Sequence, residues 1–390
     1  MNNDLNQDPD RVRKRARDQV RDRDLVVGLD AGGTRTRAVL ASAVDGRVLG
    51  QGVSGPGNAL TVPVPLLTEH LAEAVARAVP EPDRARVVAV AGGFAGAAET
   101  APDEPGRLNA LAALTAALRR LGIAADSVGV SSDIEAAFAS APGAPADGLA
   151  LVAGTGAVAM RIIDRRCAVT VGGDGWLLGD DGGGFWIGRS AVRAALRMAD
   201  GRGSPTTLAD AVGRALGVPI EALPYAEGRP NGDTGDPNSP DHADSPSSAD
   251  APTAAARERH PIEPEWSPDR RAAYRMHLLP AVMAEPPIHL ARLAPLVAEA
   301  ARHQDAVARA ILDEAADHLL EPVRALAPRK GERIVATGGL LGPEGPLTAL
   351  LSERLKALGL TLDWVADGCG GAVALARLGH GGSPPSSRTT

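Results

Sequence analysis

A strand, a glycine-rich turn and a second strand follow one another twice in this chain, more than a hundred residues apart. The first copy spans residues 25–43, with its turn at 31–33. The second spans residues 149–163, with its turn at 154–156. Each copy has the pattern that opens an α/β domain, and the long separation excludes a short-period solenoid. The repeat therefore predicts two similar α/β domains.

The length of 390 residues agrees with two cores instead of one. The expected division is a disordered tail at 1–24, an N-terminal domain at 25–133, a C-terminal domain at 134–380 and a disordered tail at 381–390. Within the second domain, residues 226–270 are rich in Pro, Gly, Ser and Asp, and we expect a disordered acidic insertion. The last helix could return to the first domain.

Other elements follow from apolar periodicity and turn residues. The expected helices are 65–79, 109–121 and 306–326, and the remaining expected strands are 47–54, 87–91, 127–130 and 334–336.

Charge and cysteine content exclude several classes of protein. A net charge of −7 argues against a general nucleic-acid binder, which needs a basic face. The two cysteines, Cys167 and Cys369, form no CxxC motif, so a zinc site, an iron–sulfur cluster or a disulfide framework is not expected. The start is too polar for a signal peptide, and no apolar run reaches membrane-spanning length. We expect a soluble cytoplasmic protein with no nucleic-acid or membrane partner.

The first turn has the residues that a polyphosphate site requires. Gly32 and Gly33 allow backbone amides to approach phosphate oxygens closely, and Thr34 adds a hydroxyl donor. Asp30, at the end of the preceding strand, can hold Mg²⁺ against the phosphates. The alternative is an ordinary hairpin that happens to follow an aspartate.

Two further glycine turns could complete a nucleotide site. Gly154, Thr155 and Gly156 can enclose a second side of a phosphate chain, although an ordinary hairpin is equally possible. Gly338 and Gly339 follow an apolar strand and could let an adenine ring lie on the backbone, or could be a simple strand exit. The chain lacks both GxxxxGK[ST] and a helix-opening GxGxxG, which excludes a P-loop enzyme and argues against a dinucleotide site.

The segment from Gly172 to Gly188 reads GGDGWLLGDDGGGFWIG. It resembles the GGWGWLLGDEGSGYWIG signature of the BadF/BadG/BcrA/BcrD ATPase family, in its N-acetylglucosamine kinase branch. The three glycine turns resemble the phosphate and adenosine segments of the wider sugar kinase/actin/chaperone superfamily. The resemblance covers residues 25–380 without the insertion. It implies an α/β protein with two RNase H-like, actin-like ATPase domains and a nucleotide cleft between them.

The resemblance also implies an activity. It is ATP-dependent, Mg²⁺-assisted phosphorylation of the 6-hydroxyl of an amino sugar, with N-acetylglucosamine foremost, by a cytoplasmic homodimer. Glucosamine, another hexosamine and N-acetylmuramate stay open as substrates, and so does a non-catalytic sensor of sugar or ATP. The electron-transfer activases of the same family are excluded, because neither Cys167 nor Cys369 is placed to hold a cluster.

Residue roles follow from the same resemblance. Asp133 is the implied catalytic base, although its sequence position also suits a helix N-cap. Asp30 is the implied metal ligand. The implied nucleotide contacts are Gly32, Gly33, Thr34, Gly154, Thr155, Gly156, Gly338 and Gly339. The implied sugar site comprises Asn58, Gly173, Asp174, Gly175 and Asp180. Asn58 could instead form an Asx-turn, and Asp180 could be only a turn residue.

The chain departs from the signature beside these sites. The usual Trp is Asp174, the usual Ser after the second turn is Ala157, the usual Glu is Asp181 and the usual Ser is Gly183. The extra carboxylate of Asp174 suggests a preference for a free amine over an N-acetyl group.

Overall fold

The computed structural model describes residues 24–97, 104–224 and 266–381. These divide into two compact units, one reaching Ile187 and resuming at Leu312, the other comprising Gly188–Ile311. The expected tails, apart from residues 24 and 381, and most of the expected insertion lie outside the described residues. The insertion ends before residue 270, however, because Ser267 caps a helix, α8 (Pro268–Met283), through its side chain.

The first sheet has five strands in the order β3-β2-β1-β4-β5. They are β1 (Leu25–Ala31), β2 (Thr36–Ser42), β3 (Val48–Ser54), β4 (Val87–Phe94) and β5 (Ser127–Ser132). β1 is buried along its whole length, as its Leu and Val content requires. It pairs antiparallel with β2 across the first glycine turn and parallel with β4.

The second sheet has the same topology, with the order β8-β7-β6-β9-β10. Its strands are β6 (Gly148–Ala153), β7 (Ala157–Ile163), β8 (Arg166–Gly172), β9 (Arg333–Thr337) and β10 (Thr361–Trp364). β6 pairs antiparallel with β7 across the second glycine turn and parallel with β9. The expectation of two similar α/β folds is therefore confirmed.

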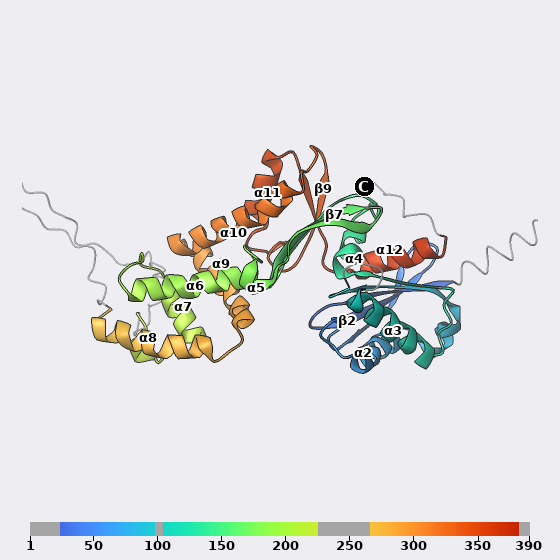
Figure 1. Ribbon diagram of the computed structural model, residues 1–390, viewed down its shortest axis with the longest axis horizontal. Coiled ribbons are helices and arrows are strands. Elements are labelled where there is room, and N and C mark those ends of the chain that lie inside the picture. Colours follow the sequence, from blue (N-terminus) through green and yellow to red (C-terminus); the bar gives the residue numbers. More distant parts are fainter. Residues whose placement is uncertain (1–23, 98–103, 225–265, 382–390) are drawn as a thin grey trace, which may run out of the picture. The chain divides into compact units, whose positions relative to one another are not determined.

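Helices cover both faces of the first sheet (Figure 1). One face carries α2 (Val64–Ala78) and α3 (Pro105–Arg120), whose apolar residues join the largest core. The opposite face carries α12 (Cys369–Gly379), drawn in red beside the blue and cyan strands. Gly28 makes this approach possible, because a Cβ there would lie 2.5 Å from the Val373 nitrogen.

A short helix, α4 (Asp133–Ala139), links the two sheets. It follows β5 directly, and its Ala137 and Phe138 pack with Ala150 of β6 and Val335 of β9. It also crosses α12 closely, since a Cβ on Gly371 would lie 1.8 Å from the Ala136 oxygen. Helix α4 is thus fixed by packing against the second sheet and against α12.

The remaining helices of the first unit are α5 (Gly175–Leu178), α11 (Thr348–Ala357) and, from Leu312 on, most of α10 (Ala306–Ala325). The second unit contains most of α6 (Gly184–Ala199), α7 (Leu208–Ala215), α8 and α9 (Ala294–Arg302). Short 3₁₀ turns occupy Glu81–Arg86, Ile220–Ala222 and Pro287–Leu293. Within the described ranges, no helix combines the length and apolarity that crossing a membrane requires.

Candidate functional site

The first glycine turn is open to solvent. Gly33 and Thr34 are exposed, and no atom lies within 4 Å of where a Cβ on Gly33 would be. The turn closes through a hydrogen bond of 2.9 Å from the Gly32 amide to the Arg35 oxygen. A phosphate group could therefore approach this backbone without a steric barrier.

Asp30 lies at the end of β1, beside this turn, and its carboxylate is nearly buried. Arg37 donates to it at 2.8 Å and also lies 3.7 Å from the Asp367 carboxylate. The Gly368 amide, just before α12, hydrogen-bonds to Asp30 as well. Burial raises the pKa of Asp30, and the neighbouring Arg37 guanidinium partly offsets that rise.

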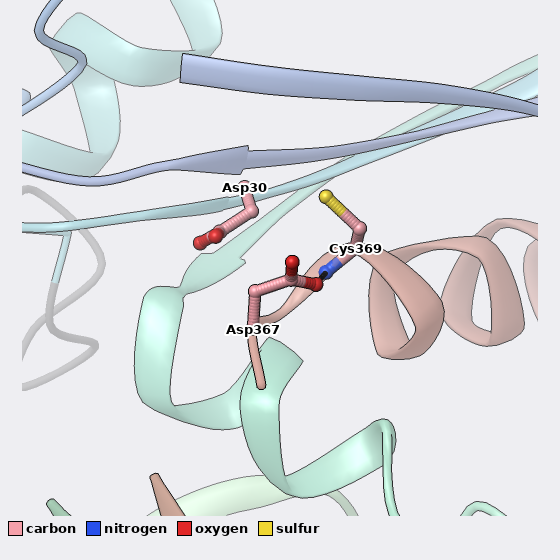
Figure 2. A group of neighbouring side chains, drawn as sticks. All are labelled: Asp30, Asp367 and Cys369. Carbon is pink, nitrogen blue, oxygen red and sulfur yellow. Dashed lines mark hydrogen bonds between the residues drawn. The ribbon is translucent and has the colours of Figure 1, made fainter. Parts of the chain in front are cut away.

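Figure 2 shows Asp30, Asp367 and Cys369 gathered where β1 meets the start of α12. One ligand atom from each lies within 4.8 Å of the others. Two carboxylates suit a hard cation such as Mg²⁺, whereas a thiol does not. Burial raises the pKa of the Cys369 thiol, which keeps it protonated. The donors that fit Mg²⁺ are thus the oxygens of Asp30 and Asp367.

Asp133 is the first residue of α4, the helix that links the two sheets. The helix is capped by Ser132, whose side chain accepts from the Glu135 amide, so the expectation that Asp133 could be the N-cap is wrong by one residue. The Oδ1 of Asp133 accepts a hydrogen bond of 3.0 Å from the amide of the adjacent Ile134. Burial, followed by the charge of Asp30, raises the pKa of Asp133 to about 6. A carboxyl group with this pKa can exchange a proton near neutral pH.

Asn58 lies in the loop after β3, directly against the first turn. The Gly57 amide donates to the Gly32 oxygen at 2.8 Å. The Asn58 Oδ1 accepts from the amides of Leu60 and Thr61 at 2.9 and 3.1 Å, which is the Asx-type turn expected as the alternative. The Nδ2 group of Asn58 is not needed for that turn, so structural and binding roles are compatible.

The second glycine turn is held by the signature segment. Asp180 accepts from the Ala157 amide at 3.2 Å, and a Cβ on Gly156 would lie 2.6 Å from an Asp180 oxygen. The amides of Gly184 and Phe185 donate to the oxygens of Gly154 and Thr155 at 2.8 and 2.9 Å. Asp180 has a positive φ of 58°, as a turn residue often does. The structure therefore places Asp180 against the second glycine turn, at residues 154–156.

The segment 172–175 connects β8 to α5. Gly172, Gly173 and Gly175 all have positive φ, a conformation that favours glycine. Gly173 donates to the Ala157 oxygen at 3.1 Å, so this segment also borders the second turn. The side chain of Asp174 is exposed and lies near Gly179.

Gly338, just after β9, lies against the second turn as well. It has a φ of +103°, and a Cβ there would be 2.2 Å from the Ala153 oxygen and 3.1 Å from the Gly154 nitrogen. Gly339 has open space where its Cβ would be. The third glycine turn is thus adjacent to the second, as a nucleotide contacting both would require.

The sequence-predicted residues accordingly form two groups, each joined by its own contacts. Asp30, the first turn, Asn58 and Asp133 lie around the end of β1. The second turn, Gly173, Asp180 and Gly338 lie around the end of β6. Helix α4 connects the groups, because it begins at Asp133 and packs against β6.

Three residues of the site were missed from sequence: Arg37, Asp367 and Glu135. Arg37 is the cross-strand neighbour of Asp30, seven residues along the chain in the β1–β2 hairpin. Asp367 comes from the far end of the sequence, so no local pattern could pair it with Asp30 or Arg37. The glycines that follow Asp367 were a usable signal, since a carboxylate before a Gly-rich helix start suggests close packing at a site. Glu135 follows Ser132 at capping-box spacing, which was also readable.

Known structures share this fold. A candidate N-acetylglucosamine kinase from Chromobacterium violaceum is 19% identical, with a TM-score of 0.58 over 90% of this chain and 99% of that one. A candidate N-acetylglucosamine kinase from Porphyromonas gingivalis is 20% identical, with a TM-score of 0.57 over 92% of this chain and 99% of that one. At these identities the likeness shows the fold alone.

Sequence comparison gives a relative and a family. An N-acetylmuramic acid/N-acetylglucosamine kinase from Clostridium acetobutylicum is 28% identical over 187 residues, which are 47% of this chain and 57% of the relative. The match thus spans little more than half of that relative's length. The sequence profile of the BadF/BadG/BcrA/BcrD ATPase family matches residues 27–362. Since this match covers most of the chain, the protein belongs to the BadF/BadG/BcrA/BcrD ATPase family.

Proposed function

We propose that this protein is an ATP-dependent sugar kinase that phosphorylates the 6-hydroxyl of an amino sugar, with N-acetylglucosamine as its first candidate substrate. The observation that carries the proposal is the position and raised pKa of Asp133. Its carboxyl group, with a pKa of about 6, lies near Asp30 at the edge of an exposed glycine turn. Membership of an ATPase family supports ATP as the phosphoryl donor. The Asp133 carboxylate can act as the base that accepts the proton of the sugar hydroxyl.

The nucleotide would contact both glycine turns. The amides of Gly32 and Gly154 close their own turns, so the amides of residues 33–34 and 155–156 would donate to the phosphates. Gly338 with Gly339 would border the adenosine. Asp30, joined by Asp367, would hold Mg²⁺, which when bound neutralises developing charge on the phosphates. Arg37 already bridges these two carboxylates, so it would keep them together when no cation is present.

The sugar would lie near Asp133, with contacts from Asn58, Gly173, Gly175 and Asp180. At neutral pH Asp133 is mostly ionised, so it can orient the sugar hydroxyl and accept its proton. The hydroxyl oxygen then bonds to the γ-phosphorus while the bond from that phosphorus to the β-phosphate oxygen breaks, releasing ADP. Such a reaction depends mainly on alignment and charge, which fixed groups provide.

Two observations bear on the choice of sugar. The curated relative's name includes N-acetylmuramic acid, so N-acetylmuramate is a second candidate acceptor. The exposed carboxylate of Asp174 would favour a cationic sugar, which keeps glucosamine as the third. A non-catalytic sensor of sugar or ATP is disfavoured, because a binder needs no ionisable base at this position.

ADP release from ATP and Mg²⁺, measured with N-acetylglucosamine, N-acetylmuramate, glucosamine and glucose, tests the proposal. We expect one of the amino sugars to stimulate release strongly. Asp133→Asn should lower kcat by about 10²-fold or more while ATP binding, followed by calorimetry, is unchanged. Wild-type turnover in Asp133→Asn, or no stimulation by any of the four sugars, would refute the proposal. Nuclear magnetic resonance of the product identifies which hydroxyl is phosphorylated.

A further inference from the structure

Glu135, at the third position of α4, carries a carboxylate that is almost completely buried. It is 1% exposed and lies two residues after Asp133 in the first turn of α4. Its Oε2 accepts from the Ser132 amide at 2.9 Å, and the Ser132 hydroxyl accepts from the Glu135 amide at 3.1 Å. This reciprocal pair is a capping box, and it uses one carboxylate oxygen.

The other oxygen of Glu135 makes a long-range contact. Oε1 accepts from the Cys167 amide at 2.8 Å, and Cys167 belongs to β8 in the second sheet. Ser132, at the other end of the same carboxylate, belongs to β5 in the first sheet. Arg166 faces Glu135 from β8 at 4.0 Å. One side chain thus joins the end of β5, the start of α4 and the edge strand of the other sheet.

The position of β8 gives this contact a functional meaning. β8 ends at Gly172 and leads directly into the segment 172–175, which borders the second glycine turn. Asp133 lies between Ser132 and Glu135, within the capping box. A capping box alone would fix the helix, whereas the bond to Cys167, near the start of β8, also ties the helix to the strand that leads into the glycine segment.

We propose that Glu135 is a positioning residue, which holds Asp133 in register with the glycine segment 172–175 by bonding the α4 start to β8. The inference rests on the proposed function of Asp133. Both carboxylate oxygens are needed, because each accepts from a different backbone amide. Glutamine offers only one acceptor oxygen, and its NH₂ group would face an amide that also donates.

The charge of Glu135 gives an independent signal. After burial and Asp30, Glu135 is a further cause of the raised pKa of Asp133. The charged groups that face this position are Asp30 from β1, with Arg37 beside it, and Arg166 from β8. Removing the Glu135 charge should lower the pKa of Asp133, so the acid limb of the rate profile should move to lower pH.

The experiment compares Glu135→Gln with Ser132→Ala, using ATP, Mg²⁺ and N-acetylglucosamine. We expect Glu135→Gln to lower kcat by about 10- to 100-fold, because small misplacements have effects of this size. The KM for ATP should be unchanged, and the acid limb should shift to lower pH. Ser132→Ala removes only the cap, so its kcat should stay within about threefold of wild type with an unshifted profile.

Equal losses of kcat in the two variants would show that Glu135 is only a helix cap, and would overturn the inference. An unchanged kcat and acid limb in Glu135→Gln would also overturn it. If Glu135→Gln does not fold, Glu135→Asp keeps the charge but is too short to reach both amides. Glu135→Asp should lower kcat without moving the acid limb. A wild-type kcat in this variant would refute the positioning role of Glu135. Asp133→Asn separates the two claims: an active Asp133→Asn refutes the proposed function itself, whereas an inactive one beside a normal Glu135→Gln refutes only the positioning role.

Discussion

The raised pKa of Asp133 predicts that its charge destabilises the native protein. Its pKa is 3.8 in an unperturbed chain and about 6 in the native state, so ionisation is less favourable after folding. The penalty begins as pH rises through the unfolded value and is complete above the native value. Two pKa units correspond to at most roughly 3 kcal/mol, since residual water screens a partly buried carboxylate. Asp133→Asn removes the charge while keeping the shape of the side chain, so it should raise the free energy of unfolding at neutral pH.

The pH dependence is the sharper part of this prediction. At pH 5 the native carboxyl is mostly protonated while the unfolded one is mostly ionised, so only about half of the penalty is present. The stabilisation by Asp133→Asn should therefore grow by roughly 1.4 kcal/mol between about pH 5 and about pH 8. Urea denaturation followed by circular dichroism at both values measures it.

Asp45→Asn is the matched control. Asp45 is exposed, and a hydrogen bond from the Arg47 amide holds its pKa below the usual value. Its contribution to stability is therefore complete above the unfolded value and lost only as pH falls below it, so it should be constant between about pH 5 and about pH 8. An Asp133→Asn effect that is equally flat, or that shrinks as pH rises, would refute the electrostatic account of this site.

Glycine pairs supply two further predictions. Gly371→Ala should lower the free energy of unfolding by about 1–3 kcal/mol or more, because its Cβ would meet the Ala136 oxygen at 1.8 Å. Gly370→Ala, one position earlier in α12 with 3.7 Å of clearance, should be neutral or stabilising by up to about 1 kcal/mol in the same urea titration. Gly338→Ala should lower the melting temperature, because it combines positive φ with a 2.2 Å contact. Gly339→Ala has open space, so it should leave the melting temperature unchanged and raise the KM for ATP several-fold; an unchanged KM would remove Gly339 from the nucleotide site.

Much of the fold could be predicted because its strands are apolar runs that end at glycines. The strand 157–163 was predicted with its observed bounds, and the strand 25–30 continues by one residue through Ala31. The helix at 306–326 was predicted to within a residue of α10, since its apolar period is strong. Duplication of the strand–turn–strand pattern was readable because each copy is local in sequence.

Weakly apolar edge elements escaped the same reasoning. β8 is mostly exposed, and β10 has only four residues, so neither has the pattern of a buried strand. Their assignment depends on hydrogen bonds to β7 and β9, which form only after the chain has folded. The bond between Glu135 and Cys167 was unreadable for the same reason, because one of its partners lies in β8.

The surroundings of Asp133 explain why its role as a candidate base could be inferred from the sequence, whereas its raised pKa could not. Small residues let β1, β4, α4 and α12 approach one another closely: a Cβ on Gly93 would lie 2.4 Å from that of Ala136, and one on Gly368 would lie 3.3 Å from an Asp30 oxygen. This close packing removes water from Asp30 and Asp133 together, and their mutual repulsion then raises the pKa of Asp133 further. The feature that lets Asp133 accept a proton near neutral pH is therefore the same feature that lowers stability when Asp133 is ionised. Activity and stability should oppose each other at this position, so the variant that loses turnover should also be the one that resists urea best at high pH.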